Sequence, residues 1–430
     1  MKPLKKPLIN VTQVGLVIGG GVSGMTAALE LGKQGFEVHI VEKEHELGGH
    51  LRNIYYLLGE KTDPQKKLHD LIEQVKQNEN IHIYTDAEVV DVYGFVGNYK
   101  SKIKQLNMLK EIEHGIIIVA TGAMEYTPTE YLYGEDRRII TQHELEKSLA
   151  KDQFKAKSVV MIQCVGARNK EKPNCARICC GQATKNALKI KEKDPEAEVY
   201  ILYKDMRTFG FKEDFYREAA AKGTLFINYD EERKPRITIE DGKLRAVFWD
   251  PVLKQEVEVE PDLLVLSAAT VPNPGNKHLA EMLKVPLTKD GFFLEAHMKL
   301  RPVDFATDGV FLCGMAHSPK YLDESIAQAC AAASRATTIL SKKTLETEGT
   351  IASVVEDLCS GCRVCEHLCP YGAVEIQIKN GKPIAHVLEA VCKGCGSCGT
   401  ACPTKAITLG HFTNQEILAQ IDAALLEEER

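Results

Sequence analysis

The sequence predicts an α/β protein with two dinucleotide-binding-type lobes, followed by a small α+β domain that is rich in cysteine. Two strand–loop–helix–strand units predict the lobes: one begins with the apolar run "VGLVIGG" and the other with "KSVVMIQ". A repeat of the spacing C-x2-C-x2-C-x3-C-P in residues 359–403 predicts the third part. The chain has 430 residues, which is long enough for several separate cores.

The composition indicates a soluble redox protein. Twelve of the fourteen cysteines fall into three tight groups, a distribution that favours metal binding over disulfides. The net charge of −6 does not favour nucleic acid or an anionic membrane surface as a partner. We find neither an apolar run of roughly eighteen residues nor the apolar core of a signal peptide. We therefore expect a cytoplasmic, iron-rich protein.

The order of the predicted elements divides the chain into six segments. The apolar strand "DGVFLCGM" and the long helix after it are expected to return the chain to the first lobe, and "SKKTLETEGT" is polar enough for a linker. The segments are the first lobe (11–155), the second lobe (156–285), the return to the first lobe (286–340), a linker (341–351), the cysteine-rich domain (352–410) and an amphipathic C-terminal helix (411–430).

The first lobe carries a dinucleotide fingerprint, Gly19-x-Gly21-x-x-Gly24, between a strand and a helix. Gly19 permits a tight turn, Gly21 lets the backbone approach a pyrophosphate, and Gly24 lets the helix pack closely on the strand. Glu42 ends the next strand, where a carboxylate accepts ribose hydroxyls. A unit that binds NAD, or nothing, is the alternative to a flavin site.

The continuation E-x5-G-G, the "ATG" at 120–122 and the late "DGVFLCG" resemble FAD-binding flavoproteins of the disulfide-reductase class. That resemblance implies FAD, with the N-terminus of the helix near residues 323–327 directed at the flavin pyrimidine ring. His50 either touches the flavin phosphate or is structural. The predicted FAD-binding residues are Gly19, Gly21, Gly24, Glu42, Lys43, Gly49, His50, Thr121, Gly122, Gly314, Ser325, Ile326 and Ala327.

The repeated cysteine runs are typical of bacterial ferredoxins with two [4Fe–4S] clusters, in which the fourth cysteine of each run binds the other cluster. A zinc ribbon would need only two C-x2-C pairs and would not explain the fourth cysteines or the prolines that follow them. We expect one cluster on Cys359, Cys362, Cys365 and Cys402 and the other on Cys369, Cys392, Cys395 and Cys398.

Four further cysteines, Cys164, Cys175, Cys179 and Cys180, occupy the loop where the second lobe would bind a nicotinamide cofactor. The loop has no G-x-G-x-x-G, so it gives a pyrophosphate poor support. Buried small residues, a vicinal disulfide and a zinc site are the alternatives to the iron–sulfur cluster that we expect there. Electrons would then pass between such a cluster and the flavin by tunnelling, instead of by hydride transfer from a nicotinamide.

The chain resembles the family of heterodisulfide reductase A subunits. The resemblance rests on stretches such as "QCVGARNKEKPNCARICCGQATKNALKIKEKDPEAEVYILYKDMRTFGFKEDFYREA", "DESIAQACAAA" and "HFTNQEILAQI". It implies FAD, a third [4Fe–4S] cluster on the four loop cysteines, and other subunits or ferredoxin-like carriers as partners. The chain looks like a short form that lacks the N-terminal domain and an inserted ferredoxin module of the family. With a single "CCG", it is not expected to reduce a disulfide by itself.

We expect the flavin to act as a two-electron hub, and hypothesise that it bifurcates electrons between the loop cluster and the C-terminal clusters. Lys185, five residues after Cys180, is either a catalytic lysine that faces flavin N5 or a solvated helix residue. The alternative functions are an NAD(P)H-dependent flavin reductase with a ferredoxin domain, and a non-catalytic electron conduit in a quinone-linked or sulfur-metabolising complex.

Overall fold

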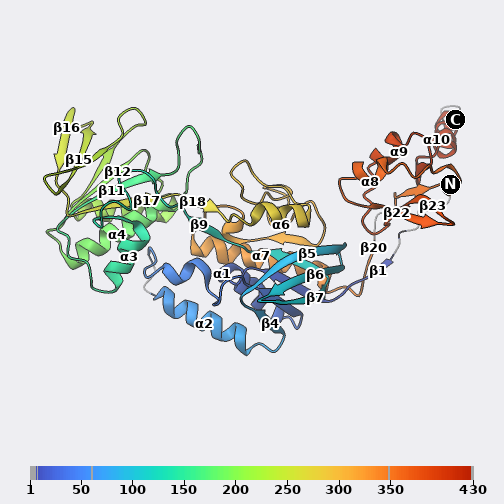
Figure 1. Ribbon diagram of the computed structural model, residues 1–430, viewed down its shortest axis with the longest axis horizontal. Helices are drawn as coiled ribbons and strands as arrows, with labels where there is room; N and C mark the ends of the chain where they lie inside the picture. The colour runs from blue at the N-terminus through green and yellow to red at the C-terminus, as the bar shows by residue number, and fades with distance from the viewer. Residues whose placement is uncertain (1–5, 7, 60–61, 347–348, 428–430) are drawn as a thin grey trace.

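The computed structural model describes residue 6 and residues 8–59, 62–346 and 349–427 (Figure 1). The first lobe lies in the middle of an elongated molecule (Figure 1). The second lobe lies at one end of it and the cysteine-rich domain at the other. The α/β fold class predicted from the sequence is confirmed.

The first lobe is built on a parallel five-stranded sheet in the order β19-β8-β2-β3-β4. Its central strands β2 and β8 read as apolar runs because both faces of the sheet are covered there. β19 comes from a segment nearly two hundred residues after β8, so the chain returns to this sheet after forming the second lobe. The strands are β2 (Val14–Ile18), β3 (Glu37–Val41), β4 (Ile81–Tyr84), β8 (Ile116–Val119) and β19 (Val310–Leu312).

Helices cover one face of this sheet and a small antiparallel sheet covers the other. α1 packs against α2 and α7 over one apolar core, and the antiparallel strands β5, β6 and β7 close a second core on the opposite face together with α6. The elements are α1 (Val22–Gly32), α2 (Pro64–Gln77), α6 (Asn276–Leu283), α7 (Leu322–Leu340), β5 (Ala87–Phe95), β6 (Asn98–Gln105) and β7 (Met108–His114).

The second lobe repeats this plan with a parallel sheet in the order β10-β17-β11-β12-β13. Helices α3, α4 and α5 belong to this lobe, and the antiparallel sheet β14-β15-β16 shares a core with the parallel sheet. The two segments that connect the lobes, β9 (Ala123–Glu125) and β18 (Thr270–Pro272), pair with each other.

The bounds of the second lobe's elements are β10 (Ile139–Thr141), α3 (Gln142–Ala150), β11 (Ser158–Val165), α4 (Cys179–Lys193), β12 (Glu198–Tyr203), the 3-10 turn η2 (Gly210–Lys212), α5 (Glu213–Ala221), β13 (Thr224–Asn228), β14 (Arg236–Glu240), β15 (Lys243–Asp250), β16 (Gln255–Val259) and β17 (Leu263–Ala268).

The cysteine-rich domain consists of two short antiparallel ladders and two five-residue helices. Its core contains cysteines of both runs together with small and β-branched residues. The elements are β21 (Ala352–Val354), the 3-10 turn η4 (Glu356–Leu358), α8 (Val364–Leu368), β22 (Val374–Lys379), β23 (Lys382–Val387), α9 (Ser397–Ala401) and β24 (Ile407–Leu409).

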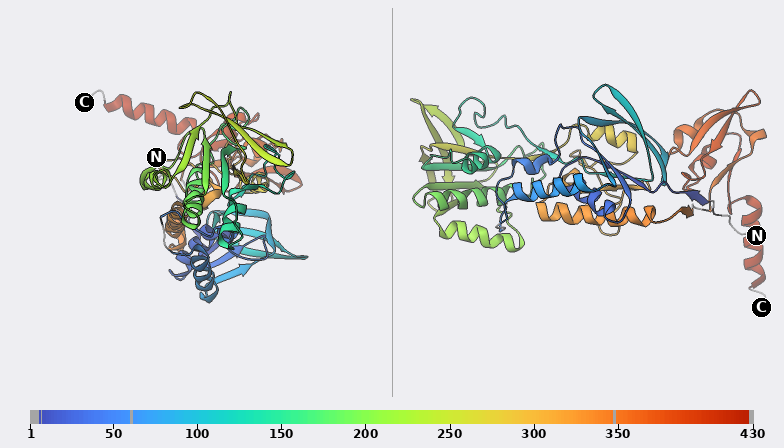
Figure 2. Two further views of the ribbon diagram at one scale, coloured as in Figure 1. Left: turned by 90° about the vertical axis from the view of Figure 1, so that its left-hand side faces the viewer. Right: turned by 90° about the horizontal axis from the view of Figure 1, so that it is seen from below.

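Two features lie at the edges of this domain. α10 (Asn414–Glu427) projects away from the rest of the molecule (Figure 2), and the last three residues of the predicted C-terminal helix lie outside the described residues. β1 (Leu8–Asn10) pairs with β20 (Thr344–Glu346), which lies within the segment that the sequence predicts as a linker. A three-residue strand is too short to produce a recognisable alternation of apolar and polar residues.

Among the described helices, none combines the length and the apolar character that crossing a membrane requires.

His114, at the end of β7, is fully buried in the first lobe. Its ring nitrogens lie 2.8 Å from Ser101 Oγ and 3.0 Å from the Ile116 carbonyl oxygen. Burial lowers the pKa of His114 to about 3. The folded protein therefore keeps this ring neutral at pH values where the unfolded chain protonates it.

This difference makes stability depend on pH. The contribution of His114 is complete above its ordinary pKa of 6.5 and falls as the pH drops toward 3. When the pH falls from about 7.5 to about 5.5, the unfolding free energy of wild type should decrease by about 1.4 kcal/mol more than that of a His114→Gln variant. Urea unfolding of both proteins at both pH values checks this.

His45→Gln is the control, because His45 is exposed and its hydrogen bond to Asp86 raises its pKa. Replacing His45 should change the pH dependence of the unfolding free energy in the direction opposite to that of replacing His114. A difference between wild type and His114→Gln that stays constant with pH would contradict the prediction.

Candidate functional site

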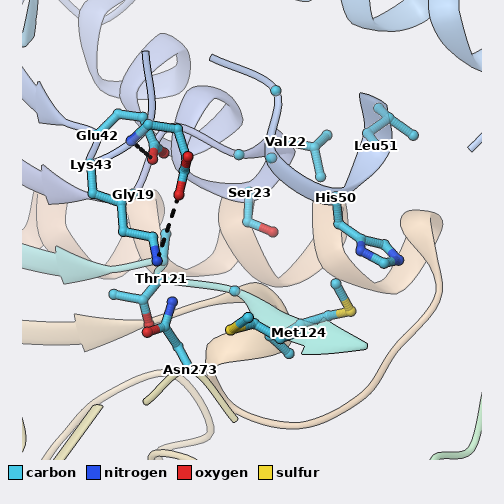
Figure 3. A pocket seen from close by; sticks show the side chains of 18 of the residues that line it. Gly19, Val22, Ser23, Glu42, Lys43, His50, Leu51, Thr121, Met124 and Asn273 are labelled. Carbon is cyan, nitrogen blue, oxygen red and sulfur yellow. Dashed lines mark hydrogen bonds and ion pairs between the residues drawn. The ribbon is translucent and has the colours of Figure 1, made fainter. Parts of the chain in front are cut away.

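A cavity of about 990 Å³ opens where the parallel sheet of the first lobe ends. Its wall includes the turn after β2, the end of β3, the segment from Gly48 to Asn53 and the start of α6 (Figure 3). Ligands in open α/β sheets bind at the carboxyl ends of the strands. Its volume lies at the upper end of the roughly 300–1,000 Å³ of ligand pockets, which suits a large cofactor.

The three fingerprint glycines have different roles at this cavity. Gly19 has a φ of +111°, and a Cβ there would lie 2.3 Å from the Ala120 carbonyl oxygen. A Cβ on Gly24 would lie 1.9 Å from the Gly19 carbonyl oxygen, so helix and turn touch at this point. Around Gly21, by contrast, nothing lies nearer than Gly49 Cα at 4.0 Å. The backbone at Gly21 and the N-terminus of α1 are therefore open to an anionic group.

Glu42 is buried at the end of β3 and is held in place by the backbone. Its two carboxylate oxygens accept hydrogen bonds from the Gly20 amide at 2.5 Å and the Glu44 amide at 2.9 Å. Each oxygen keeps a further lone pair for a ribose hydroxyl. Lys43 also lines the cavity, and its ammonium nitrogen lies 3.7 Å from Glu44 Oε1 (Figure 3).

Two histidines meet at the cavity wall. Gly49, with a φ of +51°, begins the 3-10 turn η1 (Gly49–Asn53) and directs His50 toward His143 of α3, with ring centroids 4.6 Å apart. Burial, His143 and Lys185 lower the pKa of His50 to about 3, so its ring is neutral. His143 in turn contacts Glu125 at 2.8 Å. No signal in the sequence indicated His143 or Glu125, because only the packing of the two lobes brings them here.

The opposite wall combines predicted and unpredicted residues. Thr121 donates a hydrogen bond to Asn276 Oδ1 at 3.1 Å, and Gly122 and Ser325 also line the cavity. Four predicted residues are not part of the lining: Gly24, Gly314, Ile326 and Ala327. Lining residues that the sequence did not indicate include Asn273, Asn276, Met124, Met315 and Ser23.

Gly314 has a packing role instead. It begins the 3-10 turn η3 (Gly314–Ala316), and a Cβ there would lie 2.2 Å from Ser23 Oγ of α1.

FAD fits this site. The site offers a glycine cradle, an oriented carboxylate, an exposed helix N-terminus and a large cavity. When bound, FAD supplies two-electron redox chemistry.

The cysteine runs enclose two separate small cavities in the C-terminal domain. Cys359, Cys362, Cys365 and Cys402 line one, and Cys369, Cys392, Cys395 and Cys398 line the other. Each cavity therefore receives three thiols from one run and the fourth from the other run. Within the described residues, no three His, Cys, Asp or Glu side chains converge on one metal ion; the four thiols surround a cavity.

Backbone amides point at the thiols of this domain. The amides of Ala385, Ala373 and Ala352 donate to the sulfurs of Cys359, Cys369 and Cys392 at 3.4, 3.2 and 3.4 Å. Such hydrogen bonds stabilise negative charge on sulfur and tune cluster potentials. The thiol spacing and these donors fit two [4Fe–4S] clusters.

The loop of the second lobe keeps most of its four cysteines out of solvent. Cys164, which has a φ of +62°, Cys179 and Cys180 are buried, and Cys175 is half-buried. All fourteen cysteines lie in the described part of the chain and are free thiols. Burial, Cys180 and Cys175 raise the pKa of Cys164 to about 11.

Cationic groups surround these thiols. The hydrogen bond from Cys179 lowers the pKa of Cys180 to about 7, and Arg168 and Arg207 contribute to the shift. Lys204 also acts on Cys164. Buried thiols with nearby cations suit a thiolate-bound cluster, and a cluster in this loop stays a prediction.

Lys185 lies in a buried ion pair on α4, at the contact between the lobes. Its ammonium is 2.9 Å from Glu146 Oε2 and donates to the Tyr56 carbonyl oxygen at 2.7 Å. Glu146 also accepts hydrogen bonds from the Tyr55 and Tyr56 amides. Lys185 is not among the residues that line the cavity, and its contact with a flavin stays a prediction.

The fold and the site together define a flavoprotein of the pyridine nucleotide-disulphide oxidoreductase class. Residues 15–170 match the family model of that class, and residues 358–406 match a 4Fe-4S dicluster domain. The fold is similar to thioredoxin reductase from Lactococcus lactis, with a TM-score of 0.53, 16% identity, and coverage of 76% of this chain and 98% of that one. The enzyme from T. acidophilum gives a TM-score of 0.51 at 17% identity, with the same coverage.

The chain belongs to the family of heterodisulfide reductase A subunits. It is 36% identical to the second CoB–CoM heterodisulfide reductase iron-sulfur A subunit of Methanopyrus kandleri, over 99% of this chain and 79% of that protein. It is 34% identical to the A subunit of the H2:CoB-CoM heterodisulfide, ferredoxin reductase of Methanothermobacter marburgensis, over 99% and 78%. The first alignment spans 527 positions, more than the chain has residues, so that relative carries insertions. The chain is accordingly an oxidoreductase, an electron-transfer protein with FAD and iron–sulfur clusters.

Gly24→Ala tests the glycine cradle. The added methyl group would lie 1.9 Å from the Gly19 carbonyl oxygen and would push α1 away from the turn. Overpacking of this kind costs about 1–3 kcal/mol, and FAD binding bears that cost because it needs α1 in its wild-type position, so FAD affinity should fall roughly 5- to 150-fold. Titration of the apoprotein with FAD, followed by flavin fluorescence, measures this. Gly410→Ala is the control, since nothing lies within 3.8 Å of its added methyl; equal affinities would contradict the prediction.

Glu146→Ala tests the buried ion pair between the lobes. It leaves Lys185 charged and unpaired in a buried site, which should cost about 3–5 kcal/mol of unfolding free energy. Adding Lys185→Met should recover most of that loss. Urea unfolding measures both values.

The control is Glu192→Ala on α4, the helix that carries Lys185; it breaks the exposed Lys189–Glu192 pair and should cost at most about 1 kcal/mol. A double variant as unstable as Glu146→Ala would mean that Glu146 acts through something other than Lys185.

Proposed function

We propose that the FAD of this chain is a two-electron hub that exchanges electrons with a third [4Fe–4S] cluster, held by Cys164, Cys175, Cys179 and Cys180. The observation that carries this proposal is the position of the cysteine loop against the first turn of α7. Arg177 of the loop pairs with Glu324 of that turn, and Ser325, the next residue, lines the flavin cavity.

The contact between loop and helix involves several side chains. Arg177 Nη1 donates to Glu324 Oε2 at 3.0 Å, and the Arg177 guanidinium lies over the ring of Phe209, 4.9 Å from its centroid. Phe209 meets Tyr321 edge to face, with centroids 6.1 Å apart. Lys212 lies 3.7 Å from Asp323. These contacts support a position of the loop cysteines beside the flavin cavity.

In the proposed function the second lobe has a metal site where related lobes have a cofactor pocket. In place of a glycine-rich phosphate loop it has buried thiols near Arg168, Arg207 and Lys204. Cations at this position compensate the negative charge of a thiolate-bound cluster. Electrons then enter or leave the flavin through the cluster, without a nicotinamide.

The arrangement of the parts also supports two separate electron routes. The second lobe and the cysteine-rich domain lie at opposite ends of the first lobe (Figure 1). We propose that the loop cluster serves one route and the two C-terminal clusters the other. Two distinct routes are what a bifurcating flavin requires, because the two electrons of a pair must leave for different acceptors.

The proposed partners are other subunits of a heterodisulfide-reductase-like complex and ferredoxin-like carriers in the cytoplasm. Several relatives are named as subunits of heterodisulfide, ferredoxin reductases. α10 offers a docking element, since it projects from the molecule (Figure 2) and exposes apolar side chains. These are Ile417, Leu418, Ile421 and Leu425.

Iron, sulfide and FAD per chain, after anaerobic purification, test the loop cluster. Three cubanes predict roughly twelve irons in wild type and roughly eight in a Cys179→Ser/Cys180→Ser variant, with FAD retained in both. Cys330→Ser is the control, because Cys330 is exposed and outside the three groups. Roughly eight irons in both wild type and variant would contradict the loop cluster. Rapid flavin reduction by NAD(P)H in the isolated chain would contradict the loss of the nicotinamide site.

A further inference from the structure

The hydroxyl group of Tyr321 is buried and has no hydrogen-bond partner among the described residues. Leaving a buried hydroxyl unpaired is costly, so such groups in native proteins almost always have a partner. Tyr321 immediately precedes α7 and faces the cysteine loop. Its partner is therefore a group that belongs beside that loop.

The position of the hydroxyl indicates which group this is. A Cβ on Gly181 would lie 2.5 Å from Tyr321 Oη, so the hydroxyl rests on the backbone directly after Cys180. At neutral pH a tyrosine hydroxyl is protonated and can donate a hydrogen bond. Tyr321 is not among the residues that line the flavin cavity.

The ring is fixed from several sides, so the hydroxyl has little freedom to turn away. The Lys212 ammonium lies 4.3 Å from the centroid of the Tyr321 ring, and Phe209 packs against the ring. The Tyr321 amide donates to Glu324 Oε2 at 2.8 Å, and Arg177 of the loop holds that carboxylate. The Arg177–Glu324 ion pair thus fixes the position of the tyrosine relative to the loop.

We propose that Tyr321 donates a hydrogen bond to a sulfur of the loop cluster and thereby raises the reduction potential of that cluster. The inference rests on the loop cluster of the proposed function. Reduction adds negative charge to a cluster, and a donor directed at sulfur stabilises the reduced form more than the oxidised form. Tyr321 is a positioning and tuning residue: it sets the potential of the cluster next to the flavin without binding iron.

The same contact accounts for Gly181. A side chain at this position would collide with the hydroxyl, so the residue after Cys180 must be glycine if the tyrosine is to reach the cluster. Gly181 lies within α4 without a positive φ, so its backbone conformation does not require glycine. Glycine is required at this position because the Tyr321 hydroxyl approaches the backbone closely.

The experiment is an anaerobic redox titration of full-length wild type and Tyr321→Phe, followed by electron paramagnetic resonance. The loop-cluster signal is the one that Cys179→Ser/Cys180→Ser lacks. Loss of one hydrogen bond should lower the ratio of reduced to oxidised loop cluster about tenfold at a given potential, which is a midpoint shift of about 59 mV to more negative values for a one-electron couple. The flavin and the C-terminal clusters should keep their potentials.

Tyr126→Phe is the matched control. Its ring packs in the same small cluster as Cys179 and Cys180, but its hydroxyl contacts Thr129 Oγ1 at 3.3 Å. It should leave the loop-cluster potential unchanged. Gly181→Ala provides a second route, because its methyl group displaces the hydroxyl and should shift the potential in the same direction as Tyr321→Phe.

Three outcomes would overturn the proposal. One is a loop-cluster potential in Tyr321→Phe that matches Tyr126→Phe. Another is a shift confined to the flavin, which would make the flavin the partner of the hydroxyl. The last is loss of loop iron in both Tyr321→Phe and Gly181→Ala, which would make the contact a requirement for assembly. If wild type contains only about eight irons, the loop cluster is absent and the proposed function itself is contradicted. Iron analysis identifies this case before any redox titration.

Discussion

The ion pair between Arg177 and Glu324 is the contact on which the proposed arrangement of redox sites depends. Arg177 lies in the cysteine loop with a φ of +63°, and Glu324 lies in the first turn of the helix that meets the flavin cavity. A guanidinium that donates two parallel hydrogen bonds to a carboxylate fixes the relative orientation of the two groups as well as their distance. The pair therefore holds this part of the cysteine loop against the helix that meets the flavin cavity.

A second polar contact supports the same geometry from the other side of the lobe interface. Glu146 and Lys185 are buried together and tie the Tyr55–Tyr56 backbone of the first lobe to α3 and α4 of the second. The two contacts lie at different points and so oppose rotation of the second lobe against the first. In the proposed function this matters, because a lobe that carries a cluster needs a constant distance to the flavin.

The sequence predicted those parts of the site that a short segment encodes. Glycine spacing predicted the turn at Gly19, and cysteine spacing predicted the two groups of four thiols, because in both cases the spacing itself creates the geometry. His143, Asn276 and Tyr321 could not be found in this way, since each comes from a segment far from the fingerprint and reaches its site only through tertiary packing. The fold class was predictable for the same reason as the glycine turn: apolar runs and helical periodicity are local signals. The β1–β20 pairing joins residues at the two ends of the first lobe and leaves no such signal.

Burial distinguishes the cysteines of the loop from the most exposed cysteines of the C-terminal domain. Cys179 and Cys180 are 3% and 1% exposed, whereas Cys362 and Cys395 of the C-terminal domain are exposed to solvent. Solvent exposure and hydrogen bonds to sulfur are the main means by which a protein sets cluster potentials. Around Cys179 and Cys180 water supplies few hydrogen bonds, so a donor that the protein places there has a large effect. In the proposed function, tuning by a single residue is therefore most effective at the loop cluster, and the exposed cysteines of the C-terminal domain suit exchange with a separate carrier.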